Sequence, residues 1–129
     1  MKRLFFITSF LMLYLTIQAQ TFVCTDYNYY GSLLTPQKVQ KEKAKFLGSK
    51  ATLVFFDKSL KFSSTTNGKT ESIVMDKITD NEYQIIERRG NDVNKVVLKL
   101  NKWVEYIRSF TIVGYKNNSL EGTLTYKRD

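Results

Sequence analysis

The stretch Tyr83–Leu100, YQIIERRGNDVNKVVLKL, decides the fold class. Its second half, KVVLKL, places Val96, Leu98 and Leu100 on one side and two lysines on the other. This period of two is typical of a half-buried β-strand, because successive side chains leave opposite faces of a sheet. The segment Arg89–Asp92 supplies a tight turn, since Gly and Asn tolerate the positive φ that short hairpins need. The stretch therefore predicts a β-hairpin.

The same strand–turn–strand pattern recurs along most of the chain. A turn signal follows every 8–12 residues or so, as in all-β sandwiches and barrels, and Asn67-Gly68 is a strong hairpin signal. Gly122, within the last segment, indicates a bulge or a close backbone approach. The other segments predicted as strands are Thr21–Asp26, Ala51–Phe56, Leu60–Ser63, Glu71–Asp76, Phe110–Tyr115 and Leu120–Lys127.

The segment Asn101–Ser109 fits two structures. Trp103, Tyr106, Ile107 and Phe110 follow helical spacing, whereas the flanking units are strands and the residue types favour sheets. We favour a strand. The fold class expected is all-β: an antiparallel meander of about eight strands in a sandwich or barrel.

One short helix is expected before the sheet. Thr35-Pro36 is typical of a helix start, with Thr as N-cap and Pro at the first helical position. The helix would cover Gln37–Leu47, end near Gly48, and pack over an edge or mouth of the sheet. Alternatively, its basic side docks on acidic partners or membranes. The candidate surface-contact residues combine the preceding tyrosine cluster with these lysines: Tyr27, Tyr29, Tyr30, Lys38, Lys41 and Lys45.

The N-terminus has the pattern of an export signal. Met1–Arg3 is basic, Leu4–Ile17 is apolar, and Ala19 places a small residue at the expected cleavage site. The apolar run is shorter than the roughly 20 residues of a transmembrane helix. We predict a signal peptide over residues 1–19, a single barrel domain over residues 20–129 with no transmembrane segment after cleavage, and a periplasmic or secreted location.

Composition narrows the chemistry. The 129 residues include no histidine and one cysteine, with a formal net charge of +8. Imidazole-based catalysis and zinc sites are excluded, and Cys24 has no partner for an intramolecular disulfide. We expect Cys24 to be a small buried residue. No catalytic motif, calcium loop or phosphate-binding loop is present, so we predict a non-enzyme without cofactor, metal site or specific nucleic-acid partner.

The segments ATLVFFDKSLKFS, ITDNEYQII and LEGTLTYKR, within Ala51–Lys127, resemble the small exported lipocalin-like proteins of Gram-negative bacteria. The resemblance implies a meander barrel able to hold an apolar ligand, and does not identify that ligand.

Two functions remain open. The first is an envelope protein that binds a small apolar ligand inside the barrel. The second is an interaction protein that contacts a protein or polymer through Tyr27–Tyr30 and its basic face. A narrow barrel is also readily filled by its own side chains, so the pocket candidates could equally form a solid core. These candidates are the apolar residues predicted to face inward: Leu53, Phe55, Phe62, Ile85, Leu98 and Trp103.

Overall fold

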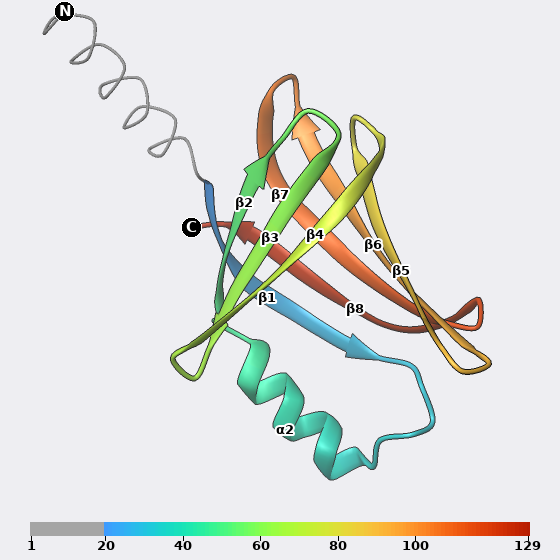
Figure 1. Ribbon diagram of the computed structural model, residues 1–129. Coiled ribbons are helices and arrows are strands. Elements are labelled where there is room, and N and C mark those ends of the chain that lie inside the picture. Colours follow the sequence, from blue (N-terminus) through green and yellow to red (C-terminus); the bar gives the residue numbers. More distant parts are fainter. Residues whose placement is uncertain (1–19) are drawn as a thin grey trace, which may run out of the picture.

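The computed structural model describes residues 20–129 as a closed antiparallel barrel (Figure 1). Eight strands follow one another around the barrel in chain order, and β8 closes the ring by pairing with β1. The predicted all-β meander barrel with one short helix is confirmed. The predicted signal peptide, residues 1–19, lies outside the described residues. The elements are β1 (Gln20–Tyr29), α2 (Pro36–Phe46), β2 (Lys50–Phe55), β3 (Ser59–Thr66), β4 (Lys69–Thr79), β5 (Glu82–Arg89), β6 (Asp92–Trp103), β7 (Tyr106–Lys116) and β8 (Ser119–Arg128).

The tight turns lie where Gly and Asn predicted them. Asn67 and Gly68 join β3 to β4 with φ of 51° and 77°, and Gly90 has a φ of 60° between β5 and β6. Asn117 and Asn118 join β7 to β8, also with positive φ. Asn adopts this left-handed conformation more readily than other non-glycine residues. The local sequence therefore sets the register of these three hairpins.

The ambiguous segment Asn101–Ser109 is extended, as favoured, but a turn divides it. Strand β6 ends at Trp103 and β7 begins at Tyr106, with Val104 at a φ of 56°. The prediction of one continuous strand was therefore wrong at its centre. A β-branched residue at positive φ is a rare choice for a tight turn, which explains why the sequence gives no turn signal there.

Helix α2 begins as predicted. The Thr35 hydroxyl accepts a hydrogen bond from the Lys38 N–H at 3.3 Å, and Pro36 is the first helical residue. No residue of α2 is fully buried. Val39, Glu42 and Phe46 are half-buried, and their spacing places them on one side of the helix.

The buried core fills the middle of the barrel. Four rings, of Phe22, Phe62, Phe110 and Tyr126, pack together with centroid separations of 4.8–5.9 Å. Cys24 is buried in β1 beside them, as expected. The remaining buried members of the core are Ala51, Leu53, Leu60, Met75, Tyr83, Leu98, Leu100, Ile107 and Ile112.

The barrel has two different ends (Figure 1). The first, here called the α2 end, carries α2 and the turns that join β3 to β4, β5 to β6 and β7 to β8. The second, here called the Trp103 end, carries the start of β1 and the turns that join β2 to β3, β4 to β5 and β6 to β7. Each end presents a different surface to solvent.

Candidate functional site

The inner wall formed by β7 and β8 tapers toward the α2 end. Three successive cross-strand pairs face the interior: Phe110 with Tyr126, Ile112 with Leu124, and Gly114 with Gly122. The paired side chains are two aromatic rings, then two aliphatic groups, then none. Since the core is close-packed where the rings lie, space opens where the glycines replace them.

Each glycine of the last pair has its own physical role. A Cβ on Gly122 would lie 2.7 Å from the Asn28 carbonyl oxygen, so only glycine lets β8 approach β1 this closely. The close backbone approach expected at Gly122 is therefore present. A Cβ on Gly114 would meet only the Gly122 carbonyl oxygen, at 3.9 Å, which is ordinary contact. Gly114 thus leaves open space that a side chain would occupy.

Strand β1 supplies the opposite wall through a β-bulge. Cys24 pairs with Tyr126, but Asp26 pairs with Thr125, so Thr25 is an extra residue in β1. Past this bulge the inward positions change parity. Tyr27 therefore lies opposite Leu124, and Tyr29 lies opposite Gly122.

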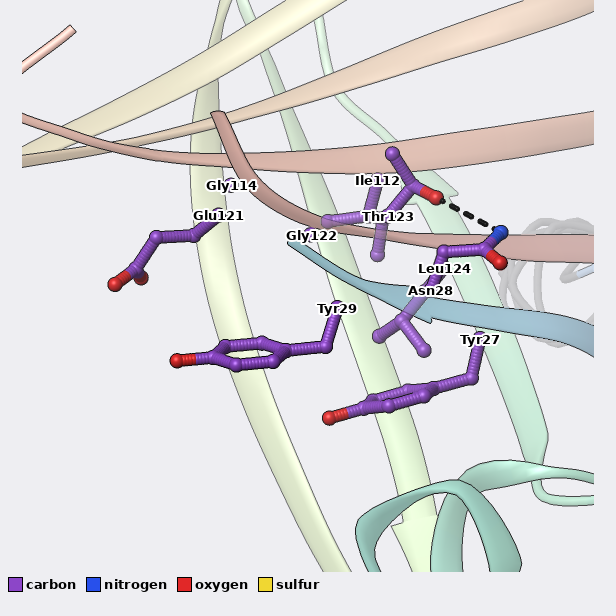
Figure 2. A pocket seen from close by; sticks show the side chains of 9 residues that line it. All are labelled: Tyr27, Asn28, Tyr29, Ile112, Gly114, Glu121, Gly122, Thr123 and Leu124. Carbon is purple, nitrogen blue, oxygen red and sulfur yellow. Dashed lines mark hydrogen bonds between the residues drawn. The ribbon is translucent and has the colours of Figure 1, made fainter. Parts of the chain in front are cut away.

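The two tyrosine rings extend side by side from β1 (Figure 2). Tyr27 stacks on Phe46 of α2, with ring centroids 5.8 Å apart and planes 9° from parallel. The Tyr29 hydroxyl accepts hydrogen bonds from the N–H groups of Leu33, at 3.1 Å, and Leu34, at 3.2 Å. Both rings are thus positioned by the connection between β1 and β2.

The tyrosine hydroxyls give the site its polar groups. Burial raises the pKa of the Tyr27 hydroxyl, and the nearby Glu42 carboxylate adds to the rise. Tyr27 therefore stays protonated at neutral pH. The Tyr29 oxygen accepts two N–H groups, which leaves its own proton free to be donated. Both tyrosines can act as hydrogen-bond donors beside an otherwise apolar surface.

We call this hollow the glycine cavity. It has a volume of about 220 Å³ and is largely open to solvent. Aromatic and aliphatic carbon makes up most of its surface (Figure 2). Its lining residues are Tyr27, Asn28, Tyr29, Ile112, Gly114, Glu121, Gly122, Thr123 and Leu124.

Two other hollows are larger but differ in character. One, of about 540 Å³, lies between the end of α2 and strands β2 and β3, and the other, of about 490 Å³, lies beside Lys77, Asp80 and Lys102. Polar and charged side chains contribute to both. Within residues 20–129, no three Cys, Asp or Glu side chains gather closely enough to hold a metal ion, and no helix is long and apolar enough to cross a membrane.

Comparison with known proteins gives a fold-level similarity. No protein-family model matches the chain, and no curated protein sequence matches it. Among solved structures, a similar chain is the "REP1-NXSQ fatty acid transporter". It shares 12% sequence identity, covers 88% of this chain and 97% of its own, and has a TM-score of 0.49. At this level of similarity, the ligand of that protein gives no information about a ligand of this chain.

The structure separates the six pocket candidates into three groups. Leu53, Phe62 and Leu98 are buried in the solid core, and Ile85 is partly buried against it. Phe55 and Trp103 are exposed at the Trp103 end, with Trp103 having 65% of its surface in solvent. None of the six lines the glycine cavity. The alternation of apolar residues predicted which side chains face the barrel interior. It did not predict where along the barrel axis the packed core ends.

The surface-contact candidates also separate. Tyr27 and Tyr29 turn inward and line the cavity, because the bulge at Thr25 reverses their side of β1. Tyr30 is exposed. The lysines, Lys38, Lys41 and Lys45, are exposed on α2.

Sequence reasoning named none of the β7 and β8 residues of the cavity wall as site residues, and the inward-facing ones that it missed are Ile112, Gly114, Gly122 and Leu124. The available signal was the presence of a glycine in each of two adjacent predicted strands. Glycine within a strand is uncommon because it weakens the strand. Two glycines at matching positions of one hairpin therefore indicate a gap in the wall, once the register is known.

Proposed function

We propose that this protein is an exported, non-catalytic binding protein that holds a small apolar ligand in the glycine cavity. The observation that carries the proposal is the Gly114–Gly122 pair, which removes two side chains from the inner wall beneath Tyr27 and Tyr29. Concave apolar sites with a few placed polar groups are the usual form of small-molecule sites. The export signal predicted in residues 1–19 is the reason for proposing an envelope or extracellular location.

The volume and the polar groups suggest the class of ligand. An apolar cavity of about 150 Å³ is large enough for benzene, and drug-sized ligands occupy roughly 300 Å³ or more. The glycine cavity, at about 220 Å³, lies between these sizes. It suits one ring or two fused rings. Tyr27 and Tyr29 would donate hydrogen bonds to an acceptor on such a ring.

A filled-cavity variant tests the proposal. Gly114→Leu places a side chain in the cavity, whereas Gly114→Ala adds only one methyl group at a position with room for it. The chain from Gln20 contains all eight strands and the whole described core, so it is a suitable test protein. Binding of 2-naphthol, indole and dodecanoate is measured by ligand-detected NMR, and the melting temperature is recorded for each variant.

We expect the ring compounds to bind, and Gly114→Leu to weaken their binding by about tenfold or more, since about 1.4 kcal/mol of lost contact is tenfold in affinity. Gly114→Ala should retain most of the affinity. Equal binding by Gly114→Leu, with its fold intact, would refute the cavity as the site. Stronger binding of dodecanoate than of either ring would refute the ligand class.

The natural ligand needs a separate measurement. Native mass spectrometry of protein purified from its own periplasm or culture medium would show a bound mass. That mass should be absent from the Gly114→Leu variant purified in the same way, and its persistence in the variant would place the ligand elsewhere.

A second candidate function is supported by the exposed face of α2. Lys38, Lys41 and Lys45 are spaced by three and four residues, so they share one side of the helix. Tyr30 is exposed in the connection just before α2. This surface would contact an acidic protein or polymer. Replacing all three lysines by Glu should abolish retention on an acidic polysaccharide column without changing the melting temperature. Unchanged retention would remove this candidate.

A further inference from the structure

The turn between β6 and β7 exposes large apolar side chains at the Trp103 end. Trp103 has 65% of its surface in solvent, Val104 has 81% and Tyr106 has 51%. These three residues lie within four consecutive positions at the tip of one hairpin. Tight turns are usually polar, so a turn of this composition calls for a physical reason.

The backbone of this turn is strained at Val104. Val104 adopts a φ of 56°, a region where a β-branched residue is a genuine outlier. Glycine or asparagine would adopt this conformation at lower cost. Strain of this kind is often concentrated at functional positions. The turn thus combines an unfavourable backbone conformation with a largely exposed apolar side chain, that of Val104.

The neighbouring turns add to the same surface. Phe56, between β2 and β3, is 53% exposed, and Ile78, near the end of β4, is 50% exposed. Phe56 belongs to the turn between β2 and β3, whereas Ile78 lies in β4 one residue before the strand ends at Thr79. Each of the three hairpins that turn at this end therefore exposes at least one large apolar side chain in or beside its turn.

Two cations accompany the aromatic residues. The Arg108 guanidinium lies over the Trp103 ring at 5.1 Å, and the Arg128 guanidinium lies over the Tyr106 ring at 4.2 Å. Arg108 is also the extra residue of a β-bulge, since Asn101 pairs with Ser109 and Lys102 with Ile107. Within residues 20–129, neither arginine forms an ion pair. Their charges are therefore available to an anion that approaches this end.

Arg128 also connects this surface to the start of the described chain. Its Nε donates to the Ile107 carbonyl oxygen at 3.0 Å, and its Nη2 donates to Gln20 Oε1 at 2.9 Å. The first described residue, Gln20, is thus bonded to the hairpin that carries Trp103. The apolar run Leu4–Ile17 joins the barrel at this point in the sequence.

We infer that the Trp103 end docks on the surface of an anionic lipid bilayer. Trp103 and Val104 enter the interfacial region, and Arg108 and Arg128 contact lipid phosphates. Trp and Tyr are enriched at membrane interfaces because their rings are apolar while one atom remains polar. Arg pairs well with phosphate oxygens. This inference concerns the opposite end of the barrel from the glycine cavity and does not depend on the proposed ligand.

The charge and the attachment point favour a bilayer over a second copy of the chain. Two arginines at the tip would face the same two arginines across a symmetric contact, and like charges would meet. A lipid surface instead supplies anions beside apolar chains. The start of the described chain lies at this same end, directly after the predicted export signal in the sequence.

Trp103 is the only tryptophan in the chain, so it reports on its own environment. The chain from Gln20 is mixed with vesicles of phosphatidylglycerol and phosphatidylcholine, and with vesicles of phosphatidylcholine alone. Insertion predicts a blue shift of the Trp103 emission and quenching by brominated acyl chains. Binding should be stronger with phosphatidylglycerol and should weaken as salt is added.

Variants separate docking from folding. Val104→Gly removes the apolar side chain and the strain, and should weaken vesicle binding by about tenfold, because the bilayer then no longer buries this side chain. Arg108→Ala should weaken binding and reduce its salt dependence, while Glu105→Lys should strengthen it. Leu33→Ser is the matched control, because Leu33 is 70% exposed at the α2 end. It should bind vesicles as the unaltered chain does.

Three outcomes would overturn the inference. The first is no emission shift and no co-sedimentation with either vesicle. The second is equal loss of binding in Leu33→Ser and Val104→Gly. The third is a concentration-dependent blue shift without vesicles, accompanied by a dimer in sedimentation velocity, which would show that the tip is covered by a second copy.

Discussion

The rings of Tyr27 and Phe46 are stacked, with centroids 5.8 Å apart and an angle of 9° between their planes. This stack joins helix α2 to the wall of the glycine cavity. Phe46 is also the α2 residue that packs against the buried core. Since no α2 residue is fully buried, this contact is central to holding the helix at the barrel mouth.

Phe46→Ala should therefore loosen α2 more than the barrel. We expect a loss of about 2 kcal/mol in unfolding free energy, below the value for a fully buried ring because Phe46 is half-buried. Hydrogen exchange should accelerate in Pro36–Phe46 and remain slow in the strands. Leu47→Ala, next to Phe46 but outside the stack, is the control. Equal acceleration in helix and strands would contradict this role of the stack.

Gly31 and Tyr29 should be energetically coupled. A Cβ at Gly31 would lie 2.5 Å from the Tyr29 hydroxyl oxygen, which accepts from Leu33 and Leu34. Gly31→Ala and Tyr29→Phe should each cost about 1 kcal/mol through loss of these hydrogen bonds. The double variant should cost clearly less than the sum, as measured by urea unfolding in a double-mutant cycle. Strict additivity would show that Gly31 does not act through Tyr29.

Tyr126 should destabilise the fold at alkaline pH. Its ring is fully buried, and burial raises the pKa of its hydroxyl to about 12. Its folded-state pKa lies above the ordinary value near 10, so the protonated form is favoured by folding. The associated stability is present below pH 10 and is lost as pH rises to 12, by about 3 kcal/mol in total. Tyr126→Phe should remove this part of the alkaline loss, as urea unfolding at pH 9 and pH 11.5 would show.

At neutral pH the same variant tests whether the hydroxyl stabilises the core. The oxygens of Tyr126 and Ser49 are buried near each other, and neither makes a hydrogen bond of good geometry within the described residues. A buried hydroxyl without a partner costs free energy. Tyr126→Phe should therefore keep or slightly raise the melting temperature at pH 7. A loss above about 2 kcal/mol would reveal a partner such as an internal water.

Val104→Gly should stabilise the fold. Glycine adopts a φ of 56° without the steric cost that a β-branched residue bears there. We expect a gain of about 1 kcal/mol in unfolding free energy, measured by urea unfolding. Val104→Ala, which keeps a Cβ, is the control and should gain less. A loss of stability in Val104→Gly would show that the side chain contributes to the fold.

The strands could be predicted from the sequence because their apolar residues alternate and their turns contain Gly or Asn. The hairpin Tyr83–Leu100 is an example: β5 and β6 meet at Gly90, with Val96, Leu98 and Leu100 turned toward the core as expected. The helix start at Thr35 was predicted for a similar reason, since an N-cap and Pro36 are local signals. Local signals were sufficient for these elements.

The glycine cavity depends on features that are not local. Its walls come from β1, β7 and β8, and the pairing of Gly114 with Gly122 follows from the register rather than from either residue alone. The residues around Thr25 include no glycine or proline, so the sequence gives no local signal for the bulge. Trp103 was expected inside because tryptophan is apolar, but its hairpin carries it beyond the end of the core.

The bulge at Thr25 has a consequence for how this protein can change over time. Deleting Thr25 would make Cys24 and Asp26 consecutive opposite Tyr126 and Thr125, so Tyr27 and Tyr29 would keep their present partners and still face inward. The side on which these tyrosines lie is therefore set by their pairing with β8 and not by the number of residues in β1. At this point β1 can lose one residue while the aromatic wall of the cavity stays in place, so strand length and ligand site can evolve independently.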